Sequence, residues 1–221
     1  MIIAIDGPAG AGKGTLAKRL AAEFDFAYLD TGSLYRAVAA RLIAQGGDPK
    51  NAEAAAAVAR ALVPEDLKRG DLRAETTSQG ASLVASYPQV RAALLAFQRD
   101  FAARPPGGKR GAILDGRDIG TVICPGAGAK LFVTASLEER ARRRHKELLD
   151  RGEESIYARV RDEMAERDRR DSDRAAAPLK PADDAFVLDT SDLDIEAAHA
   201  AALSYLRSRL EPREAADDEE E

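Results

Sequence analysis

Five short apolar runs recur along the 221-residue chain, and each run ends in polar or glycine residues. Because consecutive positions within each run are apolar, both faces of the segment would be buried, which is typical of strands in a parallel sheet. The sequence therefore predicts five central strands, at Ile2–Asp6, Phe26–Asp30, Ala112–Asp115, Leu131–Thr134 and Phe186–Asp189.

Helical patterns lie between most of these strands. After the first strand, Leu16, Leu20 and Phe24 recur at every fourth position and form an apolar stripe over Lys13–Phe24. Similar stripes predict helices at Ser33–Ala44, Leu137–Leu149 and Ile195–Leu210. The alternation of strands and helices predicts an α/β fold with a doubly wound, parallel, five-stranded sheet and ligand loops at the carboxyl ends of the strands.

Two regions interrupt this alternation. Residues 47 to about 108 contain helical patterns but no buried strand, so they are expected to form an insertion over the sheet. Residues 142 to about 176 are dense in arginine and lose their apolar periodicity towards the end. The sequence therefore predicts one domain with two elaborations, since a chain of this length suits a single α/β core.

The net charge of −5 is unevenly distributed. Residues 211–221 hold seven acidic residues and one arginine, a net of −6, so the rest of the chain carries about +1. The acidic end has no apolar periodicity, and we expect a solvated, disordered tail. A nearly neutral body with interleaved acids and bases argues against a nucleic-acid-binding protein.

Cys124 is the single cysteine, which excludes an internal disulfide and fits a reducing compartment. The opening apolar run is too short and uncharged for a signal peptide, and no run approaches the length needed to span a bilayer. We therefore expect a cytoplasmic protein without membrane partners. No pattern indicates an obligate dimer, so a monomer is expected.

The strongest chemical signal is Gly7-Pro-Ala-Gly-Ala-Gly-Lys-Gly-Thr15, between the first strand and the first helix. This is the context that a phosphate-binding loop requires, since backbone N–H groups and the helix N-terminus can surround phosphate oxygens. The Lys13 ammonium can reach the β- and γ-phosphates of a nucleotide. The spacing of the glycines does not match the dinucleotide-binding G-x-G-x-x-G pattern.

The metal ligands expected near this loop are weaker than usual. Position 14 is glycine, so the hydroxyl that commonly meets Mg²⁺ is displaced to Thr15, where we expect a weak contact. Asp115 ends the third strand, as carboxylates that hold Mg²⁺ through water do in nucleotide sites. A phosphate loop alone does not separate kinases from GTPases, ATPases or binding proteins.

Two motifs indicate an acceptor site opposite the loop. In Tyr28–Arg36, Arg36 could pair with a phosphate dianion, with a Thr31 or Ser33 hydroxyl nearby; the alternative is that Asp30-Thr31-Gly32 is only a turn and helix cap. After the third strand, Arg117 could meet a phosphate and Asp118 a base amine or ribose hydroxyl. A structural network of ion pairs is the alternative for this second motif.

The arginine-rich region is the third element. Arg167, Arg170 and Arg174 are three to four positions apart, so they share one helix face and can converge on one point. Mobile arginines that neutralise a polyanion suit a kinase, which works by positioning and electrostatics. Because acids are interleaved with these arginines, a salt-bridged, solvated helix remains an alternative.

Together these motifs resemble those of bacterial cytidylate kinases, within the nucleoside monophosphate kinases of the P-loop class. The matching text covers residues 5–16, 29–36, 115–121 and 166–174, and the resemblance extends from residue 2 to about 208. It implies a P-loop NTPase-type kinase domain at 1–208, with an acceptor-binding insertion at about 37–108 and an Arg-rich lid at about 142–176. It also implies transfer of the ATP γ-phosphoryl group to CMP and dCMP with Mg²⁺.

The resemblance also implies individual roles, which we state as expectations. The ATP-side residues would be Gly7, Gly10, Ala11, Gly12, Lys13, Gly14, Thr15 and Arg143, the last near adenine. The acceptor-side residues would be Thr31, Arg36, Ser82, Arg91, Arg117, Asp118, Arg167, Asp171 and Arg174. Among these, Ser82, Arg91 and Asp118 would read cytosine, and Lys13, Arg117, Arg167 and Arg174 would act in catalysis.

One departure from the family concerns the acceptor region. Members usually carry a small β-hairpin where this chain has only residues 62–70, so the region is shortened. Another small P-loop kinase, acting on UMP, another nucleoside monophosphate or a shikimate-like metabolite, therefore stays an alternative. A nucleotide-dependent switch is a further alternative, although the guanine-reading Asn/Thr-Lys-x-Asp segment of GTPases is missing.

Overall fold

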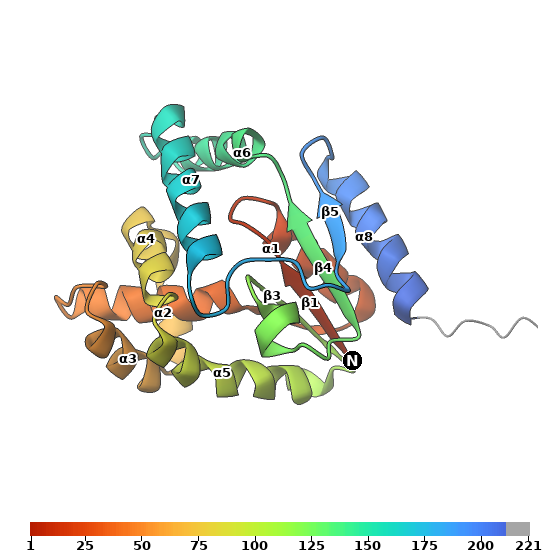
Figure 1. Cartoon of the computed structure of the whole chain (residues 1–221), viewed down its shortest axis with the longest axis horizontal. Helices are drawn as coiled ribbons and strands as arrows, with labels where there is room; N and C mark the ends of the chain where they lie inside the picture. Colours follow the sequence, from red (N-terminus) through yellow and green to blue (C-terminus); the bar gives the residue numbers. More distant parts are fainter. Residues whose placement is uncertain (211–221) are drawn as a thin grey trace, which may run out of the picture.

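The computed structural model describes residues 1–210, and the predicted acidic tail at 211–221 lies outside the described residues. Its centre is a sheet of five strands, all parallel, in the order β2-β3-β1-β4-β5 (Figure 1). The strands are β1 (Ile2–Asp6), β2 (Ala27–Asp30), β3 (Ala112–Gly116), β4 (Ala129–Thr134) and β5 (Phe186–Asp189). This confirms the predicted α/β fold and all five predicted strands.

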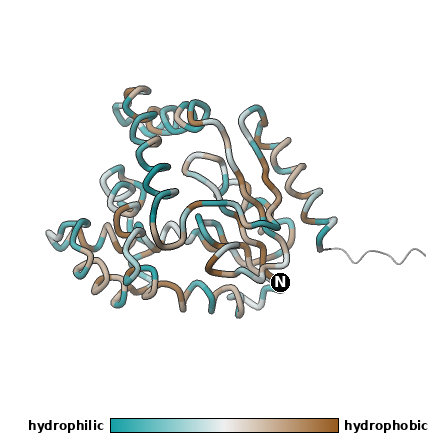
Figure 2. Tube along the Cα trace, viewed as in Figure 1, coloured by the Kyte–Doolittle hydropathy of each residue, from teal (hydrophilic) through white to brown (hydrophobic). Residues whose placement is uncertain are grey.

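Helices cover both faces of the sheet. They are α1 (Lys13–Phe24) and α8 (Ile195–Leu210) on one face, and α5 (Pro88–Ala103) with the π-helical turn η4 (Ile119–Ile123) on the other. Because side chains alternate along a strand, Ile3 and Ile5 of β1 pack under α1 and α8, whereas Ala4 between them packs towards α5 and η4. The consecutive apolar side chains of each strand thus pack into two cores, one on each face of the sheet. The strands form the hydrophobic centre of the molecule, coloured brown in Figure 2.

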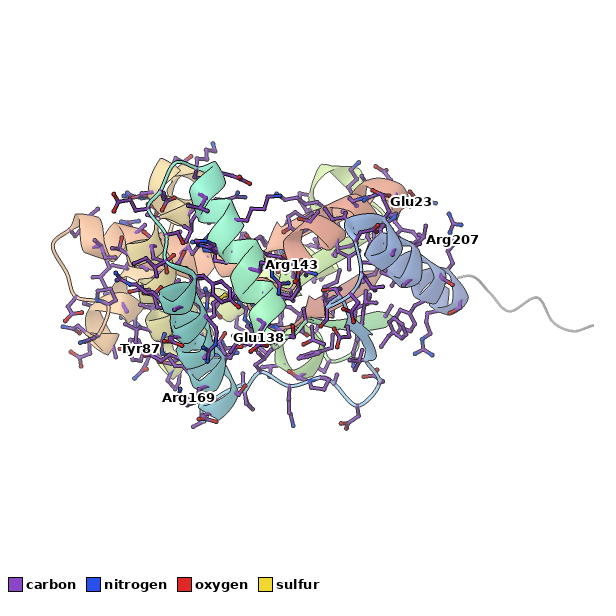
Figure 3. The ribbon with its side chains drawn as sticks, turned by 90° about the horizontal axis from the view of Figure 1, so that it is seen from above. Glu23, Tyr87, Glu138, Arg143, Arg169 and Arg207 are labelled. Atoms are coloured by element: carbon purple, nitrogen blue, oxygen red, sulfur yellow. The ribbon has the colours of Figure 1, made fainter. Side chains whose placement is uncertain are left out.

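The layer of α1 and α8 is also joined at its surface. Arg19 donates two hydrogen bonds of 2.7 Å to Glu196, and Arg207 lies 3.2 Å from Glu23, a pair visible in Figure 3. Pairs this exposed contribute little to stability, so the apolar core beneath them holds the layer. None of the described helices is long and apolar enough to cross a membrane.

Residues 31–111 contain helices but no strand. They form α2 (Thr31–Ala44), α3 (Ala52–Arg60), η1 (Pro64–Lys68), η2 (Gly70–Arg73), α4 (Glu75–Val84), α5 and η3 (Pro106–Gly108). A second core, which includes Leu34, Val38, Val84 and Leu94, joins these helices away from the sheet. The expected absence of a hairpin is correct, since the short 3₁₀ segments η1 and η2 occupy this part of the chain.

Helices α6 (Leu137–Asp150) and α7 (Tyr157–Asp173) lie across the top of the molecule (Figure 1). The weak periodicity noted in the sequence still supplies a small core of Ala141, Leu148, Val160 and Met164 between them. The remaining positions are largely charged, and α7 is accordingly teal in Figure 2. Because α6 and α7 make few apolar contacts and carry many charges, they can move relative to their surroundings.

Helix α2 begins two residues before the predicted start, because Asp30 caps it. The Asp30 carboxylate accepts a hydrogen bond from the Ser33 N–H at 3.1 Å, and its oxygen also pairs with Arg36. The turn-and-cap interpretation of Asp30-Thr31-Gly32 is therefore correct as a local structure. It leaves the Thr31 and Arg36 side chains at the carboxyl end of β2.

Gly7 is the residue whose replacement we expect to damage the fold most directly. A Cβ at Gly7 would lie 1.9 Å from the backbone oxygen of Val133, and the glycine has a φ of +145°. We predict that Gly7→Ala lowers the free energy of unfolding by about 3 kcal/mol or more, since backbone of β4 cannot yield as a side chain can. Urea denaturation followed by circular dichroism measures this.

Gly126→Ala is the matched control, because a Cβ there meets nothing within 4 Å. Its free energy of unfolding should stay within about 0.5 kcal/mol of the wild type. Equal stability of the Gly7 and Gly126 variants would contradict the prediction.

Candidate functional site

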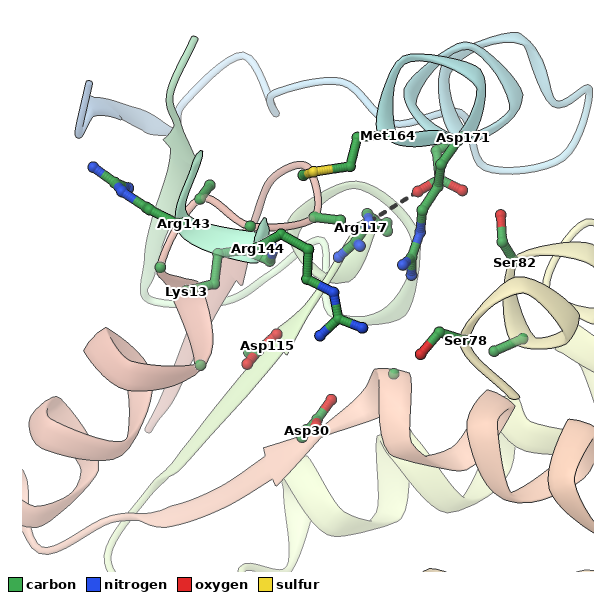
Figure 4. Close-up of a pocket in the computed structure, with 18 of the residues that line it drawn as sticks. Lys13, Asp30, Ser78, Ser82, Asp115, Arg117, Arg143, Arg144, Met164 and Asp171 are labelled. Atoms are coloured by element: carbon green, nitrogen blue, oxygen red, sulfur yellow. Dashed lines mark hydrogen bonds and ion pairs between the residues drawn. The ribbon is translucent and has the colours of Figure 1, made fainter. Parts of the chain in front are cut away.

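One cavity of about 1400 Å³ opens at the carboxyl ends of the strands, between the sheet, the helical insertion and helices α6 and α7. Apart from Gly7, every residue that the sequence predicted for ATP, acceptor or metal lines this cavity. Figure 4 shows Lys13 and Asp115 on one side of it and Ser82 on the other. The register of the parallel strands explains this convergence, because it brings the loops after all five strands to one edge.

The phosphate loop lies between β1 and α1. Gly10 and Gly12 have φ angles of +76° and +88°, a left-handed conformation that favours glycine. Lys13 is buried, and its Nζ donates a hydrogen bond of 2.7 Å to the carbonyl oxygen of Pro8. An ammonium has three donors, so Lys13 keeps donors for a ligand on the loop. Gly7 does not line the cavity, and its part is the close packing against β4.

Asp115 is held at the end of β3, beside the start of α1. Its carboxylate accepts a hydrogen bond from the Tyr28 hydroxyl at 3.0 Å, and its backbone carbonyl accepts one from Thr31 at 2.8 Å. The buried carboxylate and the exposed Thr15 hydroxyl are hard oxygen donors, which suit Mg²⁺. The described residues contain no cluster of three or more acidic, histidine or cysteine side chains that could hold a metal ion.

At the opposite end, Arg91 and Asp118 form an ion pair whose side chains are only 9% and 7% exposed. Asp118 also lies 3.9 Å from Nη2 of Arg174, which is a buried atom without a hydrogen-bond partner in the described structure. Burial raises the pKa of Asp118, and the two neighbouring guanidinium groups oppose this shift. The structure thus contains the ion-pair network considered from the sequence, and it places this network inside the cavity.

A second ion pair joins the sheet to α7. Arg117 Nε donates to Asp171 at 3.0 Å (Figure 4). Burial opposes both charges, but the Arg117 guanidinium lowers the pKa of Asp171, and the Asp171 carboxylate raises the pKa of Arg117. Arg167 lies close to both, and its buried Nε lacks a hydrogen-bond partner in the described structure, as does that of Arg36. Buried donors without a partner on several arginines at one place suit the binding of an anion.

Arg143 lies at the far side of the phosphate loop. It donates to the Thr190 carbonyl oxygen at 2.6 Å and to the Thr190 hydroxyl at 3.0 Å. That hydroxyl lies 3.0 Å from the carbonyl oxygen of Thr134 and 3.2 Å from that of Ala11. The segment after β5 therefore fixes Arg143 beside the loop. Sequence reasoning missed this segment, in which Leu193 and Ile195 add apolar surface to the cavity.

The spacing predicted that the arginines of α7 can converge on one point, but in the structure they do not. Arg167 and Arg174 face the pairs around Asp171 and Asp118, whereas Arg170 Nη1 donates to Ser82 Oγ at 2.8 Å. The helix ends at Asp173, so Arg174 lies outside its regular turns and takes a separate direction.

Two buried residues that position the site were not predicted from the sequence. Asp6 accepts hydrogen bonds of 2.7 Å from the N–H groups of Ile119 and Gly120, directly after the Arg117-Asp118 segment. The sequence feature that could have indicated Asp6 is its position as a carboxylate at the end of the first strand. Burial raises the pKa of Asp6 to about 6. Arg140 bonds the Ala9 carbonyl and pairs with Asp168 at 2.7 Å, which ties the phosphate loop to α6 and α7; the sequence showed only one more arginine.

The concentration of positive charge changes the ionisation of Lys13. Burial lowers its pKa to about 7, with further lowering from Arg117, while Asp115 acts in the opposite direction. Burial and Arg117 likewise lower the pKa of Arg167 to about 10. Both shifts show that the cavity favours added negative charge.

A family model described as cytidylate kinase matches residues 3–208 of the chain. The chain belongs to the cytidylate kinase family. The match covers nearly the whole stretch, from residue 2 to about 208, over which the motifs resembled this family. The kinase family to which it belongs uses small nucleotides, with ATP as the usual phosphoryl donor and Mg²⁺ as the usual metal.

Curated relatives agree with this assignment. The chain is 62% identical over 208 residues to a cytidylate kinase of Paramagnetospirillum magneticum, covering 94% of this chain and 98% of that protein. It is 58% identical to a cytidylate kinase of Methylocella silvestris, covering 94% of each chain. The first of these relatives is matched over almost its whole length.

The fold has a counterpart among solved structures. The crystal structure of an uncharacterized protein from Eubacterium ventriosum has a TM-score of 0.56 with 14% sequence identity, covering 95% of this chain and 99% of that one. At this level of identity the likeness concerns the fold alone.

The lowered pKa of Lys13 predicts a proton uptake on binding a nucleoside triphosphate. At a pH of about 8 most of the Lys13 side chains are neutral in the free protein, and the phosphates of the ligand favour the ammonium form. We expect close to one proton to be taken up per ligand, and affinity to fall as the pH rises above about 7. Calorimetric titration in two buffers of different ionisation enthalpy measures the uptake.

Lys13→Met is the control, because it keeps an apolar stem but cannot titrate. Its proton uptake should be smaller than that of the wild type by nearly one proton at the same pH. Equal uptake by the two proteins would assign the proton to another group.

Proposed function

We propose that this chain transfers the γ-phosphoryl group of ATP to CMP and dCMP, giving ADP and the corresponding cytidine diphosphate. Membership of the cytidylate kinase family and relatives at 58–62% identity support this activity. The structural observation that carries it is that a phosphate-loop lysine and a buried Arg91–Asp118 pair line the two ends of one cavity. The first suits a triphosphate, and the second suits a base that offers both hydrogen-bond donors and acceptors.

ATP would lie on the phosphate loop, with its phosphates against the N–H groups of residues 10–15 and the Lys13 ammonium. Arg143 and the segment around Thr190 would border the adenine, since both are fixed next to Ala11. Asp115 through water, with weak participation of Thr15, would hold Mg²⁺. The metal, when bound, would neutralise charge on the β- and γ-phosphates.

The acceptor would lie with its base against Ser82, Arg91 and Asp118. Asp118 is a hydrogen-bond acceptor and suits the exocyclic amine of cytosine. The phosphate of the acceptor would fall among Arg36, Arg117 and Arg167, where the unsatisfied Nε donors lie. Arg174 and Asp171, at the end of α7, would contact the phosphate and ribose.

Transfer needs no covalent enzyme intermediate. An oxygen of the acceptor phosphate attacks the γ-phosphorus in line, the bond from that phosphorus to the β,γ-bridging oxygen breaks, and ADP leaves. Lys13, Arg117, Arg167 and Arg174 would stabilise the charge that is redistributed over the transferred group. Because these side chains belong to the sheet and to α7, closure of the lid at about 142–176 would assemble the site and exclude water.

The same proposal covers the setting of the enzyme. One chain supplies every residue to which we assign a role, and we propose that the enzyme acts as a monomer. Cys124 is buried and unpaired, which suits a reducing cytoplasm, where nucleotides of this kind are found. We assign the kinase domain to residues 1–208, with the acceptor-binding insertion at about 37–108.

An acceptor panel tests the function. With ATP and Mg²⁺, we predict that ADP release is fastest with CMP and dCMP and slower with UMP, AMP, GMP and shikimate. The buried carboxylate of Asp118 can pair with an amine on the base but repels a carbonyl oxygen, which is the physical reason. Turnover with another acceptor would overturn the cytosine assignment, and ATP binding without turnover would favour the switch alternative.

Asp118→Ala tests the base-reading role separately. We expect the KM for CMP to rise about tenfold or more, because the amine loses its acceptor and two buried guanidinium groups lose their carboxylate. The KM for ATP should stay within about twofold, since the phosphate loop lies at the other end of the cavity. Steady-state rates with each substrate varied in turn measure both constants.

Asp173→Ala is the matched control, because this carboxylate is exposed at the end of α7 and does not line the cavity. Its two KM values should equal those of the wild type. An equal rise of both KM values in Asp118→Ala would reject Asp118 as a reader of the base.

A further inference from the structure

A hydrogen bond between α7 and α4 crosses the acceptor end of the cavity. Arg170 Nη1 donates to Ser82 Oγ at 2.8 Å, although the two residues are 88 positions apart in the chain. Ser82 is buried, with 5% of the residue exposed. The Arg170 guanidinium is held from its other side by Glu166, one helical turn earlier, at 2.9 Å. The arginine is therefore directed at the serine rather than at a phosphate.

We propose that Arg170 is a positioning residue that determines base specificity. By donating to the Ser82 oxygen, it biases the serine hydroxyl towards donating to the base, and so favours cytosine over uracil. The inference rests on the proposed function, in which Ser82, Arg91 and Asp118 read the base of the acceptor.

The chemistry of the two side chains determines which of them donates the hydrogen bond and which accepts it. A serine hydroxyl carries one hydrogen and two lone pairs, so it can donate or accept, whereas a guanidinium can only donate. The N–H of Arg170 therefore occupies one of the two lone pairs of Ser82, and its positive charge polarises the hydroxyl, which makes the serine a stronger donor and a weaker acceptor. Within the described structure this is the only hydrogen bond recorded for the Ser82 hydroxyl, so its hydrogen remains available to a ligand.

Cytosine and uracil differ at the atoms that such a hydroxyl would meet. The ring nitrogen between the two exocyclic groups bears a lone pair in cytosine and a hydrogen in uracil. A hydroxyl that can rotate would serve either base, because it can accept from uracil as well as donate to cytosine. A hydroxyl polarised by the Arg170 cation donates strongly to the cytosine nitrogen but accepts weakly from the uracil N–H, so uracil gains less from this contact.

This device is independent of Asp118. Asp118 directly precedes η4 and pairs with Arg91 of α5. Ser82 is on α4 and is contacted by Arg170 of α7. Arg144 of α6 forms a second bridge to α4, donating to Glu75 at 2.8 Å. The bond from Arg170 thus exists when α6 and α7 lie over the insertion, so selection of the base is completed on closure.

The experiment compares kcat/KM for CMP and for UMP, using ADP release by the full chain with ATP and Mg²⁺. For Arg170→Met, which keeps the length but removes the donors, we expect the ratio of CMP to UMP to fall about tenfold or more. Arg170→Lys keeps one charged donor and should retain most of the ratio. The KM for ATP and the thermal unfolding midpoint should match the wild type, which separates this effect from a general loss of structure.

Arg169→Met is the matched control on the neighbouring position. Arg169 is exposed on the outer side of α7 and does not line the cavity (Figure 3). Its ratio should equal that of the wild type. If Arg170→Met does not fold, Arg170→Ala takes its place, and the same fall in the ratio is expected.

A double-mutant cycle with Ser82→Ala tests whether Arg170 acts through the serine. We expect Ser82→Ala to lower the ratio on its own, and the addition of Arg170→Met to lower it by less than about twofold more. An unchanged ratio in Arg170→Met, or effects that multiply in the double variant, would overturn the inference while CMP turnover persists. A wild type that does not use CMP would instead overturn the proposed function, and this inference with it.

Discussion

The central physical constraint of this molecule is the repulsion among cations that one buried cavity holds together. Lys13, Arg117 and Arg167 are close enough that burial and mutual repulsion lower the pKa of Lys13 to about 7 and that of Arg167 to about 10. Three carboxylates compensate in part: Asp115 acts on Lys13, while Asp118 and Asp171 pair with Arg91 and Arg117. In each ion pair, some N–H groups of the arginine have no carboxylate partner. The cavity therefore remains short of negative charge, which the phosphates of the proposed substrates would supply.

This constraint explains why the cations come from separate bodies. Lys13 begins α1 and Arg117 follows β3, Arg36 and Arg91 are on α2 and α5, and Arg167 is on α7. If all of them belonged to one rigid element, the repulsion would persist whether or not a ligand were present. Because α6 and α7 have a small apolar core of their own, an anion between Arg167 and the other cations can favour their approach, and its departure can favour opening. The small core of α6 and α7 is consistent with that arrangement, since it packs these two helices on each other.

The sequence was sufficient for the parts of the structure that depend on local pattern. The five apolar runs predicted the strands, because a strand buried on both faces consists mainly of apolar residues. The glycine-rich loop predicted one end of the site. It was insufficient where the partner of a charge decides its role. Arg140, Arg143 and Arg144 look alike in the text, yet one bonds Ala9, one Thr190 and one Glu75. Asp6 escaped notice because its partners, two backbone N–H groups, lie 113 and 114 positions away.

The spacing of Arg167, Arg170 and Arg174 shows the same limit at one helix. Residues three and four apart do share a face, but the reach of an arginine side chain lets neighbours on that face meet different groups. Arg170 bends to Ser82, and Arg174, beyond the last regular turn, reaches towards Asp118. Helix α7, which looks like a uniform band of charge in sequence, and the residue after it thus reach two of the three residues that we assign to the base. That division lets one closing movement bring charge to the phosphate and hydrogen-bond direction to the base, so catalysis and selection of the acceptor depend on the same step.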